Sequence, residues 1–535
     1  MKRSNDIFPA FVLVLVLALA NATPIRAQVP NLFVTSEHCM ACHNGLVTPA
    51  GEDVSIGVGW RGSMMANAAR DPYWQAAVRR EILVHPTASA AIQNECSACH
   101  MPMMRFQANA EGHQGEVFSH LPLSHGDELA ADGVSCSVCH QIGEGQLGER
   151  SSFTAGFELD TNTPEGERHV FGPYDVDAGR TSLMRSASRF LPAKGEHVQS
   201  SELCATCHTL ITHTLDANGR VLGEFPEQVP YLEWKHSAFA GVRSCQSCHM
   251  PVIDGETAIS SVLGVPREAV SRHVFRGGNI LMPRILNAHR QELAVSALPQ
   301  ELQTTVHQTE KNLQTAAATV SLVNAGVENG VLRTEVVITN LAGHKLPSAY
   351  PSRRTWVHFT VWDAVGEMVF ESGGLNPDGS IRGNANDTHA TRFEPHHLEI
   401  DHPEQVQIYE AVMGAPDGAV TTVLLSAITY LKDNRLLPDG FDKATADDDV
   451  AVHGGAGADE DFVGGRDRIR YTVDVSEAEG PFIVDVELMY QPVGYRWAHN
   501  LGDHEAEEIE RFIAYYEEAA DSSAVVLASA KAIAE

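Results

Sequence analysis

The five-residue pattern Cys-x-x-Cys-His occurs five times in this chain of 535 residues. The copies begin at Cys39, Cys96, Cys136, Cys204 and Cys245, and together they use all ten cysteines. A disulfide framework scatters its cysteines, and a tetrahedral zinc site needs two cysteine pairs, so five pairs do not divide among such sites. Covalent c-type haem needs the whole pattern, because both thiols attach to the porphyrin and the adjacent imidazole binds the iron. The motif count therefore predicts five covalently bound haem c groups.

Each predicted haem has two attaching thiols and one proximal imidazole. The attaching residues are Cys39, Cys42, Cys96, Cys99, Cys136, Cys139, Cys204, Cys207, Cys245 and Cys248, and the proximal iron ligands are His43, His100, His140, His208 and His249. Five large apolar plates in one short part of the chain must supply much of its core and lie against one another. Closely packed redox centres of this kind are suited to passing electrons along a row.

The second axial ligand of each iron distinguishes an electron carrier from a catalyst with an open haem. Sixteen histidines precede residue 300, which is a large supply for five irons. Local sequence favours His197, His236 and His273 as distal ligands, with His125 as a fourth candidate. For each of these residues the alternative is an ordinary solvated or hydrogen-bonded histidine.

Methionine offers a second kind of axial ligand. Met64 and Met65 are expected on one helix that ends and restarts at Asp71 and Pro72, which have the N-cap and first-turn pattern of a new helix. A thioether ligand from Met65 would raise the potential of its haem relative to bis-histidine ligation. The alternative is that these methionines pack against a porphyrin face or a core.

The N-terminus and the overall charge indicate the compartment and the kind of partner. Residues 1–27 have early basic residues, an apolar run and then small residues, which is typical of a cleaved signal peptide. No later segment is apolar for long enough to span a membrane. The net charge of −31 argues against nucleic acid and favours neutral or cationic partners. We therefore expect a periplasmic or secreted protein without a transmembrane segment.

The chain changes character near residue 300. Beyond it there are no cysteines, and apolar and polar residues alternate in runs such as TVSLVNA, VLRTEVVITN, RTWVHFTVWD, GEMVFESG, VTTVLLSA, RIRYTVDV and PFIVDVELMYQP. Turn residues separate these runs, a pattern typical of an antiparallel sandwich. The predicted fold is α+β: a helical, loop-rich haem domain over residues 28–298, then a β-sandwich domain over 299–535 that ends in a helical tail.

Two features of the second domain carry charge that could serve the haems or a metal. The segment GHKLPSAYPSRRTWVHF offers His344, Lys345, Arg353 and Arg354; its cations would either pair with haem propionates or form an internal salt-bridge corner. His344 is also an alternative haem ligand. Aspartates at 447–449 and 459–461 are possible calcium ligands, although they match no EF-hand loop and solvated surface is the alternative.

The motifs DGVSCSVCHQI, SSELCATCHTL, SCQSCHMP, RHVFRGGN and GHKLPSAYPSRR resemble a family of exported bacterial multihaem cytochromes. The predicted haem domain is similar to the tetrahaem cytochromes that partner hydroxylamine oxidoreductase. The resemblance runs from about residue 36 to 500 and implies covalent haem c, bis-histidine ligation at most haems and electron transfer. It also implies distal roles for His197, His236 and His273, and leaves the distal ligand of the haem at Cys39 open.

Two classes of function follow. The first is a pentahaem electron carrier that exchanges electrons with redox protein partners. The second is a multihaem oxidoreductase that converts a small nitrogen or sulfur compound at one open haem. The motifs end in histidine, and none has the lysine that replaces it in nitrite-reducing relatives, so the carrier is the preferred interpretation and catalysis stays uncertain. Oligomers or haem filaments are further possibilities that the sequence does not decide.

Overall fold

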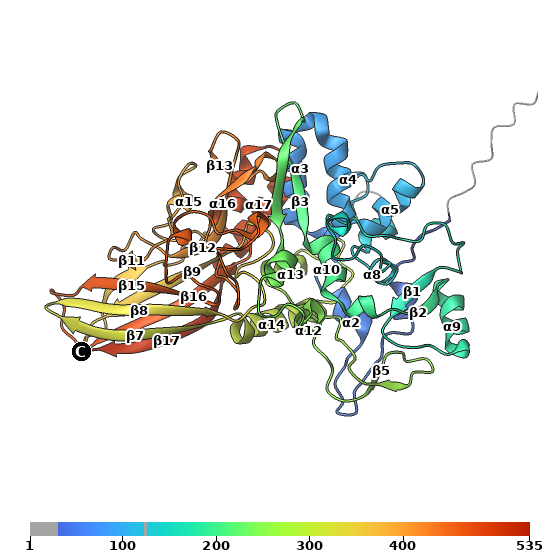
Figure 1. Cartoon of the computed structure of the whole chain (residues 1–535), viewed down its shortest axis with the longest axis horizontal. Coiled ribbons are helices and arrows are strands. Elements are labelled where there is room, and N and C mark those ends of the chain that lie inside the picture. Colours follow the sequence, from blue (N-terminus) through green and yellow to red (C-terminus); the bar gives the residue numbers. More distant parts are fainter. Residues whose placement is uncertain (1–29, 122–125) are drawn as a thin grey trace, which may run out of the picture.

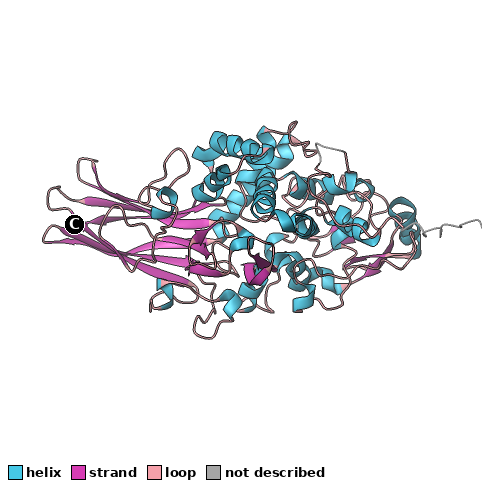
Figure 2. Cartoon of the chain, turned by 90° about the horizontal axis from the view of Figure 1, so that it is seen from above, coloured by secondary structure: helices cyan, strands magenta, loops and turns pink. Residues whose placement is uncertain are grey.

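The computed structural model describes residues 30–121 and 126–535. The predicted signal peptide and the candidate ligand His125 lie outside the described residues. The described chain is elongated, with helices gathered at one end and long strands at the other, where the C-terminus also lies (Figures 1 and 2). The helix-rich part carries all five cysteine motifs, and the strands follow it in sequence.

The first part of the chain consists of short helices joined by long loops. The helices are α1 (Glu37–Met40), α2 (Ile56–Arg61), α3 (Pro72–Val84), α4 (Ser89–His100), α5 (Pro102–Ala110), α7 (Glu128–Ala131), α8 (Cys136–Cys139), α9 (Ala178–Ser188), α10 (Ser201–His208), α11 (Pro230–Lys235), α12 (Cys245–His249) and α13 (Leu281–Ala288). Three small ribbons pair β1 (His169–Gly172) with β2 (Leu191–Lys194), β3 (Leu210–Leu215) with β4 (Val221–Gln228), and β5 (Thr257–Ala258) with β6 (Pro266–Arg267).

The start of α3 shows how local sequence fixes this part. Asp71 caps the helix by accepting hydrogen bonds from the backbone N–H groups of Tyr73 and Trp74, and Pro72 occupies the first turn, as predicted. The preceding prediction was wrong, because Met64 and Met65 lie in a turn and not on a helix. There the Met65 carbonyl accepts a hydrogen bond from the N–H of Val134 at 2.9 Å, so a tertiary contact shapes the segment.

The second part is built on two sheets. The larger sheet contains β9 (Arg354–Trp362), β10 (Met368–Ser372), β12 (Ile408–Gly414), β13 (Val420–Thr421), β14 (Thr429–Asp433), β16 (Phe482–Gln491) and β17 (Val525–Ala534), and the smaller contains β7 (Ala318–Glu328), β8 (Val331–Asn340), β11 (Glu399–Ile400) and β15 (Arg466–Asp474). The strands are antiparallel except for β11, which runs parallel to β15. Phe359 of the larger sheet and Tyr471 of the smaller stack at 3.9 Å inside a shared apolar core.

The α+β prediction agrees with these elements, with two corrections. The run over residues 420–427 forms only β13 and a short 3₁₀ turn, since it lacks a full-length neighbouring strand. The predicted helical tail is helical only in α17 (Glu507–Ala519); the residues that follow form β17, which pairs along the length of β16. Pairing with a neighbouring strand overrides the alanine-rich local sequence there.

The two parts share one core. Helix α14 (Pro299–Ala316) and helices α16 (Tyr495–His499) and α17 belong in sequence to the second part. Tyr73 of α3, Leu281 of α13 and Phe512 of α17 lie in the same buried apolar cluster. Outside this cluster, Arg79 forms a two-armed ion pair with Glu508 at 2.8 Å. The boundary at residue 298 therefore crosses a continuous core, and its status as a domain boundary stays a prediction.

Short helix α15 (Ala385–Thr388) completes the second part.

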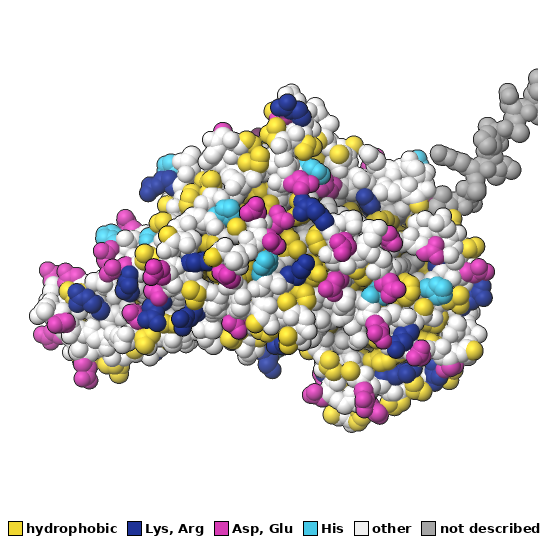
Figure 3. Space-filling view, in the orientation of Figure 1, with side chains coloured by type: hydrophobic (Ala, Val, Ile, Leu, Met, Phe, Trp, Pro, Cys, Tyr) yellow, Lys and Arg dark blue, Asp and Glu magenta, His cyan; other side chains and the backbone are white. Residues whose placement is uncertain are grey.

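Acidic and basic side chains are interspersed over the face shown in Figure 3, on the helical and the stranded part alike. No helix among residues 30–121 and 126–535 is both long and apolar enough to cross a membrane.

Candidate haem sites

Each Cys-x-x-Cys-His motif forms or ends a short helix. The motifs lie on α1 and the turn after it, on the last turn of α4, on α8 with the following residue, on the second half of α10, and on α12. One helical turn brings the first cysteine, the second cysteine and the histidine to neighbouring positions around a single plate. All ten cysteines are free thiols, as covalent attachment to a porphyrin requires.

The five motifs lie against one another. Thiols of different motifs lie close enough to shift one another's pKa in three pairs, Cys39 with Cys136, Cys99 with Cys207, and Cys204 with Cys245. In each pair the neighbouring thiol lowers the pKa of one cysteine and raises that of the other, and the pKa of Cys245 falls to about 7. Burial raises the pKa of Cys139 to about 12, and the Cys207 thiol adds to it. The motif at Cys204 therefore adjoins three others and is the centre of the cluster.

Four of the proximal imidazoles share one hydrogen-bonding pattern. In each, Nδ1 donates to a backbone carbonyl: His43 to Ile259 at 2.6 Å, His100 to Ala68 at 3.2 Å, His140 to Phe171 at 2.5 Å, and His249 to Arg276 at 2.6 Å. A carbonyl oxygen can only accept, so these bonds leave Nε2 as the free nitrogen. Metal-bound histidines are oriented in the same way.

Burial favours the neutral form of His100, His140 and His249, as iron ligation requires. It lowers the pKa of His140, and lowers the pKa of His100 and His249 to about 4. The ring of His100 also stacks on Trp74 of α3, with ring centres 4.4 Å apart and planes within 5°. His100, His140 and His249 are therefore oriented, neutral imidazoles suited to binding iron.

The ring of His273, which is a predicted distal ligand, lies beside a proximal imidazole. Its ring centre is 6.3 Å from that of His140, and the two planes are 20° apart. Two imidazoles that share one metal through bonds of about 2 Å have ring centres about 6 Å apart. Nδ1 of His273 donates to the Ser271 carbonyl at 3.1 Å, which again leaves Nε2 free. This pair fits two axial ligands of one haem iron.

A second such pair contains His344, which the sequence offered only as an alternative haem ligand. His344, in the loop after β8, has its ring centre 6.2 Å from that of His249, with planes 14° apart. The candidates favoured by local sequence all precede residue 300, where the cysteines end. The adjacent Lys345 is fully buried in the structure, so this segment faces the interior.

The other predicted distal ligands have different surroundings. Nε2 of His197 donates to the Ile142 carbonyl at 2.9 Å, and its buried Nδ1 has no partner in the described chain. Nε2 of His236 lies 3.1 Å from a carboxylate oxygen of Asp447. Neither ring is paired with a proximal imidazole among the described residues, and Met65 is described above. The axial roles of these residues stay predictions.

The cations of the GHKLPSAYPSRR segment divide into two groups. Lys345 and Arg354 are buried in ion pairs with Asp433 and Asp387, so the salt-bridge alternative is right for them. Arg353 has no carboxylate partner in the described part of the chain and donates to the Ser348 carbonyl at 2.9 Å. Burial, and then this guanidinium, lower the pKa of His208. Arg353 is thus the cation available to an anionic group near the fourth motif.

Asp459, one of the proposed calcium ligands, belongs to a buried cluster with His396 and Asp467. Nε2 of His396 lies 3.0 Å from Asp459, while Gln407 and Asn434 donate to its Nδ1. Every member is hydrogen-bonded, and calcium prefers ligand sets made only of oxygen. The cluster fits a hydrogen-bonded core better than a calcium site.

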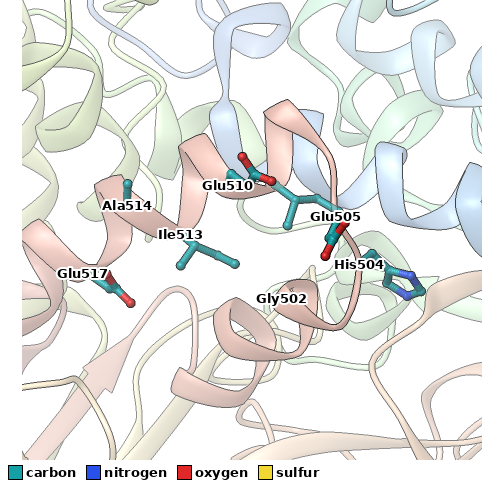
Figure 4. Close-up of a pocket in the computed structure, with 8 residues that line it drawn as sticks. Gly502, His504, Glu505, Glu510, Ile513, Ala514 and Glu517 are labelled. Atoms are coloured by element: carbon teal, nitrogen blue, oxygen red, sulfur yellow. The ribbon is translucent and has the colours of Figure 1, made fainter.

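A cavity of about 310 Å³ lies beside α17, away from the motifs (Figure 4). Glu505, Glu510 and Glu517 surround Ile513 in its wall, together with His504. No motif cysteine or histidine lines it, so it is separate from the candidate haem sites.

No protein-family model matches the chain, and no curated protein matches its sequence. Its structure is similar to that of a penta-heme cytochrome c552 from Thermochromatium tepidum, with a TM-score of 0.50 and 14% sequence identity. The alignment covers 94% of this chain and 100% of that chain. At this level of identity the similarity concerns the fold and extends over both the helical and the stranded part. The chain therefore has the overall fold of a penta-haem cytochrome.

Proposed function

We propose that this protein is a pentahaem c-type cytochrome that carries electrons between redox partners outside the cytoplasm. The observation that supports this most strongly is the joining of all five motifs into one cluster, with parallel imidazole pairs across two of the expected iron positions. The similar fold of a penta-heme cytochrome adds support. Bound haem c would supply a one-electron iron couple at each motif.

The chain's own residues have three tasks in this role. The motif cysteines would hold each porphyrin through thioether bonds, and the proximal imidazoles would bind the irons through Nε2. The Nδ1 hydrogen bonds to backbone carbonyls fix the ring orientations, which keeps the ligand field constant while the iron changes charge. The fourth motif adjoins three others, so we expect it to be the branch point of electron flow.

Mass spectrometry of the denatured holoprotein tests covalent attachment. The polypeptide should carry five haem masses, and replacing Cys245 and Cys248 together with alanine should remove one. An unchanged haem count in that variant would contradict attachment at α12. Replacing Ser244 and Ser247, which directly precede the same two cysteines, is the matched control and should leave five haem masses.

A second candidate function is reduction or oxidation of a small nitrogen or sulfur oxyanion at the haem of the fourth motif. The observation in its favour is His208, which pairs with no other imidazole in the described part of the chain and has the uncompensated Arg353 nearby. Binding of carbon monoxide to one ferrous haem would support this function if added nitrite or sulfite changes that binding. The change should depend on Arg353. Complete absence of binding would favour the carrier.

Export and partners belong to the same proposal. The leader-like residues 1–27 and the acidic surface favour a periplasmic or secreted carrier that meets basic or neutral redox proteins. The likeness of the motifs to tetrahaem cytochromes makes an enzyme such as hydroxylamine oxidoreductase one class of electron donor. We expect such a donor to reduce the holoprotein at low salt, and we expect this reduction to be lost at high salt.

A further inference from the structure

We propose that His344, from the stranded part of the chain, is the second axial ligand of the iron held by His249. The proposal rests on haem attachment at Cys245 and Cys248, as inferred above. Its consequence is that the β-sandwich part is more than a cover over the haem row, because it completes the coordination of the fifth haem.

The first argument is the geometry of the two rings. Their centres are 6.2 Å apart and their planes differ by 14°, which matches the roughly 6 Å expected for two imidazoles on one metal. Nδ1 of His249 donates to the Arg276 carbonyl at 2.6 Å, and Nδ1 of His344 donates to the Lys345 carbonyl at 2.8 Å. In the described part of the chain neither Nε2 has a hydrogen-bond partner, so both remain available to a metal.

The second argument is agreement with the pair at the third motif. His140 and His273 have the same separation within 0.1 Å, the same near-parallel planes and the same use of Nδ1. His273 was predicted as a distal ligand from its sequence context alone. Two independent parts of the chain thus place an imidazole in the same relation to a motif histidine.

The third argument is how firmly the loop around His344 is held. The His344 carbonyl accepts a hydrogen bond from the side chain of Asn340 at 2.9 Å. The backbone N–H of Lys345 donates to Glu233 of α11 at 3.1 Å, and the Lys345 ammonium donates to Asp433 of β14 at 2.7 Å. Arg435 forms ion pairs with both carboxylates at 2.7 and 2.8 Å.

These four charged side chains are at most 6% exposed, and they join the helical part to the stranded part. Glu233 belongs to the helix just before the fifth motif, while the other three belong to the sandwich. The network therefore fixes the loop that carries His344 relative to α12, as a ligand supplied from a distant part of the chain requires.

Replacement of His344 by glycine in the full-length holoprotein tests the proposal. Low-temperature EPR should lose the signal of one low-spin ferric haem and gain a high-spin signal, and one ferrous haem should bind carbon monoxide in addition to any that binds it in the parent protein. Added imidazole should enter the space left by the side chain and restore the low-spin signal. His358→Gly, in β9 and hydrogen-bonded to Glu371 and Glu487, is the matched control and should change neither readout.

His344→Met is a second variant for the case that the glycine variant does not accumulate. It should keep six-coordinate iron and raise the potential of one haem only. An unaltered EPR spectrum, five unaltered potentials and no added carbon monoxide binding, in variants that still carry five haems, would overturn the role of His344. A missing haem mass in the parent protein would instead count against the proposed function itself.

Discussion

Asp433→Asn is the change that most directly probes the buried ion network that holds the His344 loop. Asp433 pairs with Lys345 and Arg435, and Arg435 also pairs with Glu233, so the network contains two cations and two carboxylates. Removing one carboxylate leaves a buried cation without its partner, which costs about 3–5 kcal/mol of unfolding free energy. The side chains concerned are at most 6% exposed, so little of this cost is recovered from water.

Urea unfolding of the holoprotein, followed by far-UV circular dichroism, measures this loss. Combining Asp433→Asn with Lys345→Met removes one charge of each sign, and we expect the pair to lose less stability than Asp433→Asn alone. Asp485→Asn is the control, because its ion pair with Lys531 lies at the surface and is worth less than about 1 kcal/mol. A loss below about 1 kcal/mol for Asp433→Asn would refute the reasoning.

The same network gives stability a pH dependence with a defined sign. Although burial alone would raise it, the pKa of Asp433 is held below its ordinary value by Arg435 and Lys345. A depressed carboxyl pKa contributes stability above the unfolded value of about 3.9, and this contribution is lost as the pH falls below it. The acid side of the stability profile should therefore be less steep in Asp433→Asn than in the parent protein.

Three further predictions concern stability. Burial, followed by the charges of Glu81 and Glu95, raises the pKa of Glu227 to about 8. The free energy of unfolding should therefore fall as the pH rises from about 4.5 to about 8. Glu227→Gln should remove that pH dependence in thermal melts recorded at several pH values. Asp71→Ala removes the N-cap of α3 and should cost about 1 kcal/mol in urea unfolding, with Asp71→Ser retaining most of the stability. Phe359→Ala should cost about 3–5 kcal/mol by the same assay, against about 1 kcal/mol or less for a surface substitution.

The parts of this molecule that the sequence predicts are those that local chemistry decides. A motif of five residues is enough to predict haem attachment, and strands with one buried face are predicted from alternation, as in β8, β15 and β16. Strand β12 has no such alternation, because every one of its residues is buried. Likewise β17 is a strand only because β16 is beside it.

The positions of the candidate distal ligands depend on long-range packing, so the sequence predicts them least well. His273 was predicted because the glycines that follow it let the backbone approach a porphyrin closely, and its ring lies beside the histidine of the third motif. His344 is nearly a hundred residues beyond His249, and only the packing of the sandwich on α11 brings the two together. The spacing of residues in a sequence gives no indication of such a contact, so the pairing of these two rings is visible only in the structure.

A reductive titration of the purified holoprotein tests the central claim most directly. With absorbance of the haem bands and EPR followed as electrons are added under anaerobic conditions, the account predicts five electrons taken up per chain. It also predicts that all five haems stay attached after denaturation. Uptake of fewer than five electrons by a fully processed chain, or release of haem on denaturation, would contradict it.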